Sequence, residues 1–224
     1  MVLKIKEIYR EVIKNKKYRI FPKNFIEKII KRNINKKNPV KKTRKDLREV
    51  YLMYEGLRKE EEVEDLIKII YKTILIKKVK ILDLGCGEFP LYLETIEKYF
   101  KIISYTGVDI SRTLKERMPK KVKFIVDDLI DPKKDWTNQK YDIIFLFNLI
   151  PVIEKLEKNS GKKLLNKIKK IGGYIVISFP LYSISKRRYI GHYWKKWVNE
   201  NLDKEKILFS HENKEIVFIL KCFS

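Results

Sequence analysis

Apolar residues recur at intervals of three and four through the first third of the chain. This spacing places them on one face of a helix and predicts helices rather than strands. The predicted helices cover residues 5–13, 25–30, 47–57 and 60–76. Pro22 suits the first turn of the second helix, and the third is expected to end or kink near Gly56. Residues 33–43, broken by Pro39, are expected to form a basic connection.

From Lys78 onward short β-branched runs alternate with amphipathic segments. The predicted strands cover residues 79–84, 104–108, 122–126, 141–147 and 174–179, and the predicted helices cover residues 90–99, 112–117, 161–170 and 186–200. Residues 207–210 and 215–220 are expected to close the chain as an antiparallel pair. Such alternation indicates a parallel sheet covered by helices on both faces. We therefore expect an α/β domain over residues 78–224, preceded by a small all-helical domain over residues 1–77.

Positive charge is concentrated near the N-terminus. The chain has 52 Lys and Arg against 29 Asp and Glu, and the first fifty residues hold 18 of the basic residues but 5 of the acidic ones. Neutralised phosphates release counterions, so this excess favours a nucleic-acid partner. The alternative is a lysine-rich composition that serves solubility. On the first interpretation, the clusters that contain Lys16, Lys17, Lys36, Lys37, Lys41 and Lys42 contact RNA.

Several classes of protein are disfavoured by composition. The only cysteines are Cys86 and Cys222, too few for a disulfide framework or a zinc site, so no metal is expected. No apolar run approaches the roughly twenty residues that a membrane span needs. The first residues alternate in charge, unlike a signal peptide. We expect a soluble, cytoplasmic monomer.

The strongest motif is the segment Ile81–Gly87, where an apolar strand runs into a glycine turn before a helix. Glycines there let the backbone approach a ligand at the carboxyl end of the strand. Phe89 and Pro90 stand where a dinucleotide fingerprint has its third glycine, and no phosphate-loop Gly-Lys-Ser/Thr follows. The D-L-G-C-G form instead resembles the first motif of the class I methyltransferases, which bind S-adenosylmethionine.

Acidic residues end the next two predicted strands. Asp109 comes 22 residues after Gly87, a spacing that suits an acceptor for ribose hydroxyls. Asp127 and Asp128 end the third strand; each alone is more typical of a cap or a turn. The methyltransferase resemblance implies that Asp83, Gly85, Cys86 and Gly87 lie along the methionine part of the cofactor, Asp109 and Ile110 at the ribose, and Asp127, Asp128 and Leu129 at the adenine.

The segment after the fourth strand bears on the substrate. Residues 147–151 do not match the N/D-P-P-Y loop of amino-group methylation. Neither cysteine is placed to attack a pyrimidine ring, and the two histidines, His192 and His211, come late in the chain. A ring nitrogen with a free lone pair needs no general base, so positioning would do most of the work.

Two segments carry a narrower resemblance. Asn148–Glu154 and Ile175–Arg187 are similar to the K-L-x-P-x-L-E and S-F-P-x-x-S-L-x-x-R segments of the aminoglycoside-resistance methyltransferases of 16S rRNA, which modify N7 of a decoding-site guanine. Their D-x-x-C-G-x-x-P loop is matched by Asp83, Cys86, Gly87 and Pro90, and their T-R-x-x-L element by Thr43–Leu47. The resemblance covers residues 41–191.

The resemblance implies a Rossmann-like core with a mostly parallel seven-stranded sheet whose last strand is antiparallel. It implies a helical domain that docks on the small ribosomal subunit, and S-adenosylhomocysteine as product. Arg44 and Asn148 would contact the cofactor; Asn148, Ser178, Ser183 and Arg187 would position the target, and Lys186, Arg187 and Arg188 would contact RNA. Asn148 departs from the family pattern, which has lysine there.

Two other functions stay open at this stage. A methyltransferase of another RNA, a small molecule or a protein would leave the basic N-terminus without a role. An RNA-binding protein with a vestigial methyltransferase fold would bind RNA and show no affinity for the cofactor. The basic and aromatic residues near Arg188 suit phosphate contact and base stacking, but they also suit a helix with an apolar stripe and a solvated face.

Overall fold

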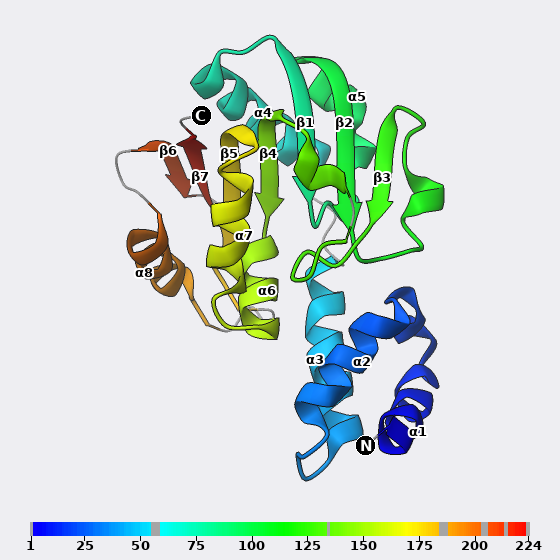
Figure 1. Ribbon diagram of the computed structural model, residues 1–224. Coiled ribbons are helices and arrows are strands. Elements are labelled where there is room, and N and C mark those ends of the chain that lie inside the picture. The colour runs from blue at the N-terminus through cyan, green and yellow to red at the C-terminus, as the bar shows by residue number, and fades with distance from the viewer. Residues whose placement is uncertain are drawn as a thin grey trace.

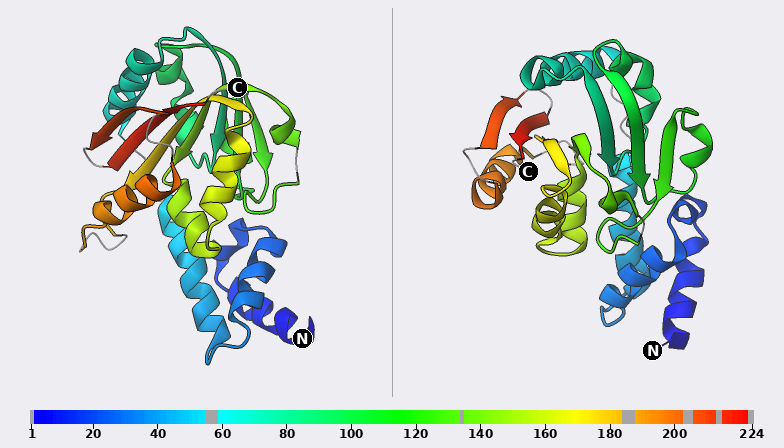
Figure 2. Two further views of the ribbon diagram at one scale, coloured as in Figure 1. Left: turned by 60° about the vertical axis from the view of Figure 1, so that its left-hand side comes forward. Right: turned by 45° about the horizontal axis from the view of Figure 1, so that its top comes forward.

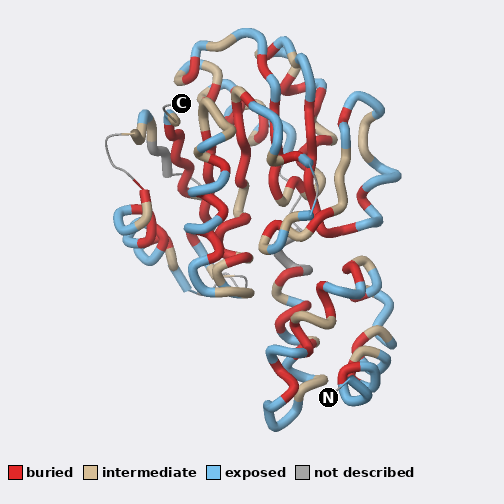
Figure 3. Tube along the Cα trace, in the orientation of Figure 1, coloured by how far each residue is buried: buried red, intermediate tan, exposed pale blue. Residues whose placement is uncertain are grey.

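A small helical unit lies against one edge of a seven-stranded sheet (Figure 1). The computed structural model describes residues 2–54, 59–133, 135–183, 188–202, 206–212 and 215–222. Buried segments are concentrated in the strands and on the inner faces of the helices (Figure 3). Within the described residues no helix is long and apolar enough to cross a membrane.

The helical unit consists of α1 (Val2–Ile13), α2 (Lys23–Asn33) and α3 (Pro39–Tyr54), with a 3-10 turn over Lys16–Ile20. The first two helices confirm the prediction from apolar spacing, with Pro22 at the N-cap of α2. The expected connection over residues 33–43 is wrong in its second half, because α3 already begins at Pro39. Asn38 accepts a hydrogen bond from the Lys41 amide (2.9 Å), and proline has no N–H to lose in a first turn. Gly56 lies outside the described residues.

Helix α4 (Glu60–Ile74) packs with the sheet rather than with the helical unit. Its buried residues, Val63, Ile67 and Ile70 among them, share a cluster with Ile81 of the first strand and Phe100. The helical unit has a separate cluster built on α1, α2 and α3. We therefore propose that the division expected at residue 77 falls between α3 and α4.

The seven strands are β1 (Lys78–Leu84), β2 (Lys101–Asp109), β3 (Val122–Val126), β4 (Tyr141–Phe147), β5 (Gly172–Pro180), β6 (Ile207–Glu212) and β7 (Glu215–Lys221). Their order is β3-β2-β1-β4-β5-β7-β6, and β7 runs antiparallel to both of its neighbours. This confirms the Rossmann-like sheet with an antiparallel last strand. The parallel strands place their carboxyl ends at one edge, which is where the helical unit lies (Figure 2).

Helices cover both faces of the sheet. On one face lie α6 (Leu149–Leu156), α7 (Ser160–Ile168) and α8 (Gly191–Asn201). On the other lie α4, a 3-10 turn over Phe89–Tyr92 and α5 (Leu93–Glu97). Alternate residues of β1 serve the two layers: Ile81 packs on the α4 side and Leu82 on the α6 side.

Some helix predictions need correction. Helix α6 had not been predicted, because its apolar run directly continues that of β4. The expected helix over residues 112–117 is a 3-10 turn over Lys115–Arg117. The helix expected from residue 186 corresponds to α8, which begins at Gly191. Residues 186 and 187 lie outside the described residues.

The helical unit is fixed to the sheet domain mainly through α6. Arg32 of α2 donates from Nη1 to the carbonyl oxygens of Lys155 (2.8 Å) and Leu156, at the C-terminal end of α6. A guanidinium suits that position because the carbonyls of a last turn lack intrahelical partners. Val152 and Leu156 of α6, together with Ile110, pack against the apolar cluster of the helical unit.

A buried polar network joins α2 to α3 and gives the first prediction. The Asp46 carboxylate accepts from Asn33 Nδ2 (2.8 Å) and from Lys42 Nζ (2.7 Å). Burial opposes ionisation of Asp46, but these two hydrogen bonds outweigh it and lower its pKa. Asp46→Asn should lower the free energy of unfolding at pH 7 by about 1–2 kcal/mol.

The pH dependence of that loss is its check. The pKa of Asp46 is lower in the folded than in the unfolded chain, so its contribution is present above the unfolded value, about pH 4. It disappears as the pH falls through the folded value. Urea denaturation should therefore show a difference in unfolding free energy between the unmodified protein and the variant at pH 7. This difference should become smaller toward pH 3. A difference in unfolding free energy that does not change with pH would contradict an ionic origin of the Asp46 contribution.

Candidate active site

The turn after β1 is built for close approach of a ligand. Gly85 (φ 65°) and Gly87 (φ 51°) both adopt left-handed conformations. The amides of Gly85 and Cys86 donate to the Val108 carbonyl at 2.8 and 3.2 Å, which ties the turn to β2. A Cβ on Gly85 would lie 2.7 Å from Leu149 Cδ1, so a larger residue does not fit.

Asp109 fixes this turn from the end of β2. Its carboxylate is fully buried. Oδ2 accepts from the Gly87 amide (3.0 Å), and Oδ1 accepts from the Ser111 amide (2.7 Å). The structure thus brings the predicted acidic residue to the glycine turn, and shows that it holds the turn in place as well as ending β2.

The side chains of Asp83, near the end of β1, and of Cys86, within the turn, are both buried. The Tyr105 hydroxyl donates to Asp83 Oδ2 (2.8 Å), and burial raises the pKa of Tyr105, which keeps the donor protonated. Burial, with Asp83 and Asp109 close by, also raises the pKa of the Cys86 thiol well above its usual range. A protonated, buried thiol is a poor nucleophile, in agreement with the exclusion of pyrimidine attack.

The two acidic residues after β3, Asp127 and Asp128, have different partners. Asp127 shapes the loop: it accepts from Trp136 Nε1 (2.9 Å) and from the amides of Asp128 and Lys133. Asp128 Oδ1 accepts from the Ile130 amide (3.0 Å), and Oδ2 lies 3.8 Å from Nζ of Lys28 on α2. Asp128 therefore faces the helical unit, whereas Asp127 is occupied within its own loop.

These strand ends surround one narrow cavity. Its walls come from the glycine turn, the residues after β2 and β3, and α6; they include Gly85, Ile110, Asp127, Asp128, Leu129, Ile130, Leu149, Val152, Ile153 and Leu156. Phe25 of α2 and Val50 of α3 complete the lining. The free volume is about 30 Å³, the space of roughly one or two water molecules. The helical unit thus forms part of the wall around the predicted cofactor residues.

Asn148 follows β4 in a left-handed conformation (φ 52°) that asparagine tolerates better than most residues. Its amide donates to the Ser178 carbonyl (3.2 Å) and to Ser178 Oγ (3.1 Å). Its Nδ2 donates to Glu215 Oε2 (3.3 Å), and because a carboxylate only accepts, this contact fixes the orientation of the side-chain amide. Asn148 Oδ1 is buried and has no hydrogen-bond partner among the described residues.

Ser178 itself does not reach the surface. It is fully buried, so the expectation that it borders a target base needs correction: its contact is with Asn148, which it positions. Ser183 does lie at the surface, and its Oγ accepts from the Arg188 amide (3.3 Å). Arg187, expected to act with them, lies outside the described residues.

A wide groove of about 1410 Å³ opens beside Asn148. Lys45 and Arg48 of α3, Lys155 of α6 and Lys158 just after α6 contribute cations. Pro180, Tyr182, Ser183, Tyr193, Trp194 and Trp197 contribute the apolar and aromatic lining. Tyr182 and Tyr193 are 53% and 56% exposed, whereas the two tryptophans are buried against Phe179. The apolar stripe is therefore confirmed for the tryptophans, and phosphate contact with base stacking stays a prediction.

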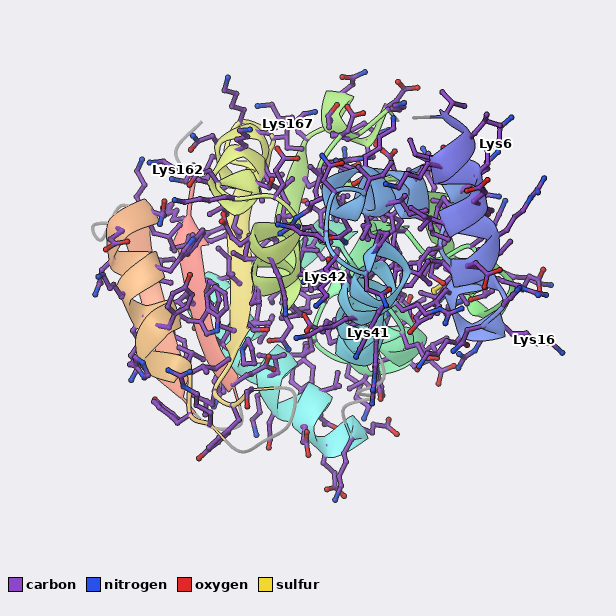
Figure 4. All side chains as sticks on the ribbon, turned by 90° about the horizontal axis from the view of Figure 1, so that it is seen from below. Lys6, Lys16, Lys41, Lys42, Lys162 and Lys167 are labelled. Carbon is purple, nitrogen blue, oxygen red and sulfur yellow. The ribbon has the colours of Figure 1, made fainter. Side chains whose placement is uncertain are left out.

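The expected basic residues take two kinds of position. Lys16, Lys36, Lys37, Lys41, Lys42 and Arg188 are exposed, and Lys17 is half-buried; Figure 4 shows Lys16, Lys41 and Lys42 on the helical unit. Arg44 instead donates from Nη2 to the Glu11 carbonyl of α1, and it is not among the residues that line the cavity. Its contact with a cofactor stays a prediction. Lys186 lies outside the described residues.

Several site residues had not been predicted. Phe25, Lys28 and Val50 come from the helical unit, and Leu149 and Glu215 come from α6 and β7. Apolar residues of a helix carry no local sign of which cavity they border, so only the fold reveals them. No group of three or more His, Cys, Asp or Glu that could hold a metal occurs among the described residues.

Several solved structures with the same fold are rRNA methylases. The 16S rRNA methylase RmtB matches with a TM-score of 0.65 and 17% identity, and the match covers 98% of both chains. The 16S rRNA methyltransferase RmtF, solved with S-adenosyl-L-homocysteine, matches with a TM-score of 0.71 and 14% identity over 98% of both chains. An rRNA methylase from Escherichia coli matches at 0.64 and 19% identity, over 98% of this chain and all of the other.

Sequence comparison gives the family. No curated protein matches the chain. The model of the methyltransferase domain, however, matches residues 18–213, which include part of the helical unit and nearly all of the sheet. The glycine turn, the buried Asp109 and the strand order agree with that match. The chain belongs to the methyltransferase-domain family.

Proposed function

We propose that this chain transfers a methyl group from S-adenosylmethionine to RNA of the small ribosomal subunit, at N7 of a decoding-site guanine. The observation that carries the proposal is the groove beside Asn148. It joins cations of the helical unit and of α6 to exposed aromatic rings. Phosphate contact together with base stacking is the usual means of RNA recognition. The structures of the 16S rRNA methylases RmtB and RmtF support the proposal by their shared fold.

The residues at the strand ends fit the cofactor chemically. We assign Gly85 and Gly87 to its methionine part, Asp109 and Ile110 to the ribose, and Asp128 and Leu129 to the adenine. Of these, Gly85, Ile110, Asp128 and Leu129 line the cavity, and Asp109 is buried behind the glycine turn that it holds. A carboxylate at the end of β2 is the acceptor that ribose hydroxyls require. Because the cavity is narrow, its apolar wall (Phe25, Val50 and Leu149) has to move outward when a nucleoside enters.

S-adenosylmethionine supplies a methyl group on a sulfonium, which a nitrogen lone pair takes up without release of a proton. The protein's task is then to hold the base. We propose that entry of the base into the groove uncovers the buried, unpaired Asn148 Oδ1, which then accepts a hydrogen bond from the amino edge of the guanine, while Tyr182 or Tyr193 stacks on its ring. The groove as described has no histidine in its lining, which suits an acceptor nitrogen that needs no general base.

Cofactor affinity should depend on Asp109. Asp109→Asn replaces one acceptor oxygen by an NH₂ group opposite a backbone N–H donor, so it loosens the glycine turn. Loss of one hydrogen bond to a charged group should raise the Kd for S-adenosylhomocysteine about ten- to hundredfold in calorimetry.

A matched control lies at the opposite edge of the sheet. There Asp142 Oδ2 accepts from the Lys80 amide (2.6 Å), so Asp142→Asn alters the same kind of bond at the start of β4. It should leave the Kd unchanged. Equal affinities of the Asp109 variant and the unmodified protein would rule out the assigned cofactor site.

Asn148 should act on the base rather than on the cofactor. Asn148→Ala removes the unpaired Oδ1, so kcat/KM for RNA methylation should fall about tenfold while the Kd for S-adenosylhomocysteine stays within about threefold. Asn199→Ala, an exposed asparagine on α8 outside the groove lining, should change neither value. An equal loss in both measurements for Asn148→Ala would instead assign Asn148 to the cofactor.

The reaction itself can be located directly. The protein is incubated with tritiated S-adenosylmethionine and either purified small subunits or naked rRNA, and the label is mapped by primer extension after borohydride–aniline cleavage. We expect label at a decoding-site guanine, with the strand scission diagnostic of N7 methylation. Label at another nucleotide would keep the chemistry and refute the target. Cofactor binding without label in any RNA would refute the RNA substrate.

A further inference from the structure

Helix α7 carries a row of exposed lysines on the sheet domain. Residues 154–170 include seven lysines and two glutamates. While Leu164, Leu165 and Ile168 pack inward, the exposed lysines lie on the outer face. We call Lys162, Lys163 and Lys167 of α7, with Lys170 just after its end, the α7 lysine face.

Neither of the two nearby glutamates pairs with Lys162, Lys167 or Lys170 within the described residues. Glu154 accepts from the amides of Asn159 (2.9 Å) and Gly161 (2.8 Å), so it caps the start of α7. Glu157 lies 3.8 Å from Lys28 Nζ of the helical unit and 3.4 Å from Lys163 Nζ. Of the α7 lysine face, Lys163 alone has a carboxylate partner within the described part of the chain.

On the opposite face of the sheet, helix α4 is acidic. Helix α4 holds five acidic residues and two lysines within Glu60–Ile74. Nearby lysines there are paired: Lys98 Nζ lies 3.0 Å from Glu64, and Lys121 Nζ lies 2.9 Å from Glu97. A lysine-rich composition that served solubility alone would not separate charge by face. The polarity therefore points to a polyanion on the α7 side.

The α7 lysine face continues the basic surface of the helical unit. The groove is lined by Lys45 and Arg48 of α3, by Lys155 of α6 and by Lys158 just after it, and Lys158 lies four residues before Lys162. Arg32 holds the two parts together at the end of α6. Figure 4 shows Lys41 and Lys42 of the helical unit and Lys162 and Lys167 of α7 in the same view from below.

We propose that the α7 lysine face contacts the phosphates of a second RNA segment, beyond the segment that the helical unit and the groove hold. The inference rests on the proposed RNA substrate and adds to it a docking surface on the sheet domain. Ammonium groups on flexible stems act as point charges toward phosphates, so the contact would position the RNA without reading its sequence.

The test compares matched pairs of lysines. Lys162→Gln/Lys167→Gln removes two charges from the α7 lysine face, and Lys68→Gln/Lys72→Gln removes two exposed charges from α4 on the other face. Binding of each protein to purified small subunits is measured by filter retention across a salt series, with S-adenosylhomocysteine present. Calorimetry with S-adenosylhomocysteine and thermal melting check that both variants stay folded.

The α7 variant should bind about tenfold more weakly near 0.1 M salt, and the slope of log K against log salt should become shallower by about 1.4, since each lost phosphate contact removes about 0.7. The α4 variant should match the unmodified protein, and Lys162→Arg/Lys167→Arg should retain binding. Equal losses of binding in the α7 and α4 variants, or no loss in either, would overturn the inference. The RNA substrate would still stand in that case, because the unmodified protein binds the subunit. No binding by the unmodified protein would overturn the RNA substrate and the inference together.

Discussion

The attachment of the helical unit to α6 is the contact on which the rest of the site depends. Arg32 satisfies two carbonyls that the last turn of α6 leaves without partners, and Lys28 reaches Asp128 and Glu157 from the same helix. Val152 and Leu156 also pack against the apolar cluster of the helical unit, so burial of apolar surface adds to these polar contacts. Without this contact neither the cavity nor the groove would have its second wall.

That arrangement gives α6 a role in both regions. Leu149, at its start, lies over Gly85 and borders the cavity, and Lys155, at its end, lines the groove and pairs with Glu49 of α3. A displacement of the helical unit therefore alters the cavity and the groove together, which are the proposed sites of cofactor and RNA. Two binding events that bias one shared element are coupled with equal free energy in both directions. The narrowness of the cavity gives that coupling a structural origin in Phe25 and Val50.

The sequence predicted the features that depend on periodicity and on order along the chain. The strands and the meeting of Gly85, Gly87 and Asp109 follow from apolar runs and from spacing, because parallel strands end at one edge. The antiparallel last strand of the sheet was implied by the family resemblance. The side on which α4 packs could not be predicted, since its apolar stripe would suit either unit. Nor could the burial of Ser178, because a serine in a motif carries no sign of whether it faces a ligand or a backbone amide.

The residues around Asn148 explain how asparagine can stand where the family motif has lysine. The related methyltransferases have lysine at this position, and a lysine here would meet the Glu215 carboxylate as its counterion. Asparagine satisfies the same carboxylate through Nδ2 and leaves a neutral acceptor, Oδ1, in place of a cation. The left-handed backbone, the two contacts to Ser178 and the Glu215 contact all constrain this amide. In the proposed N7 methylation the base gains a positive charge, and a neutral acceptor beside it would avoid the repulsion that an ammonium would add.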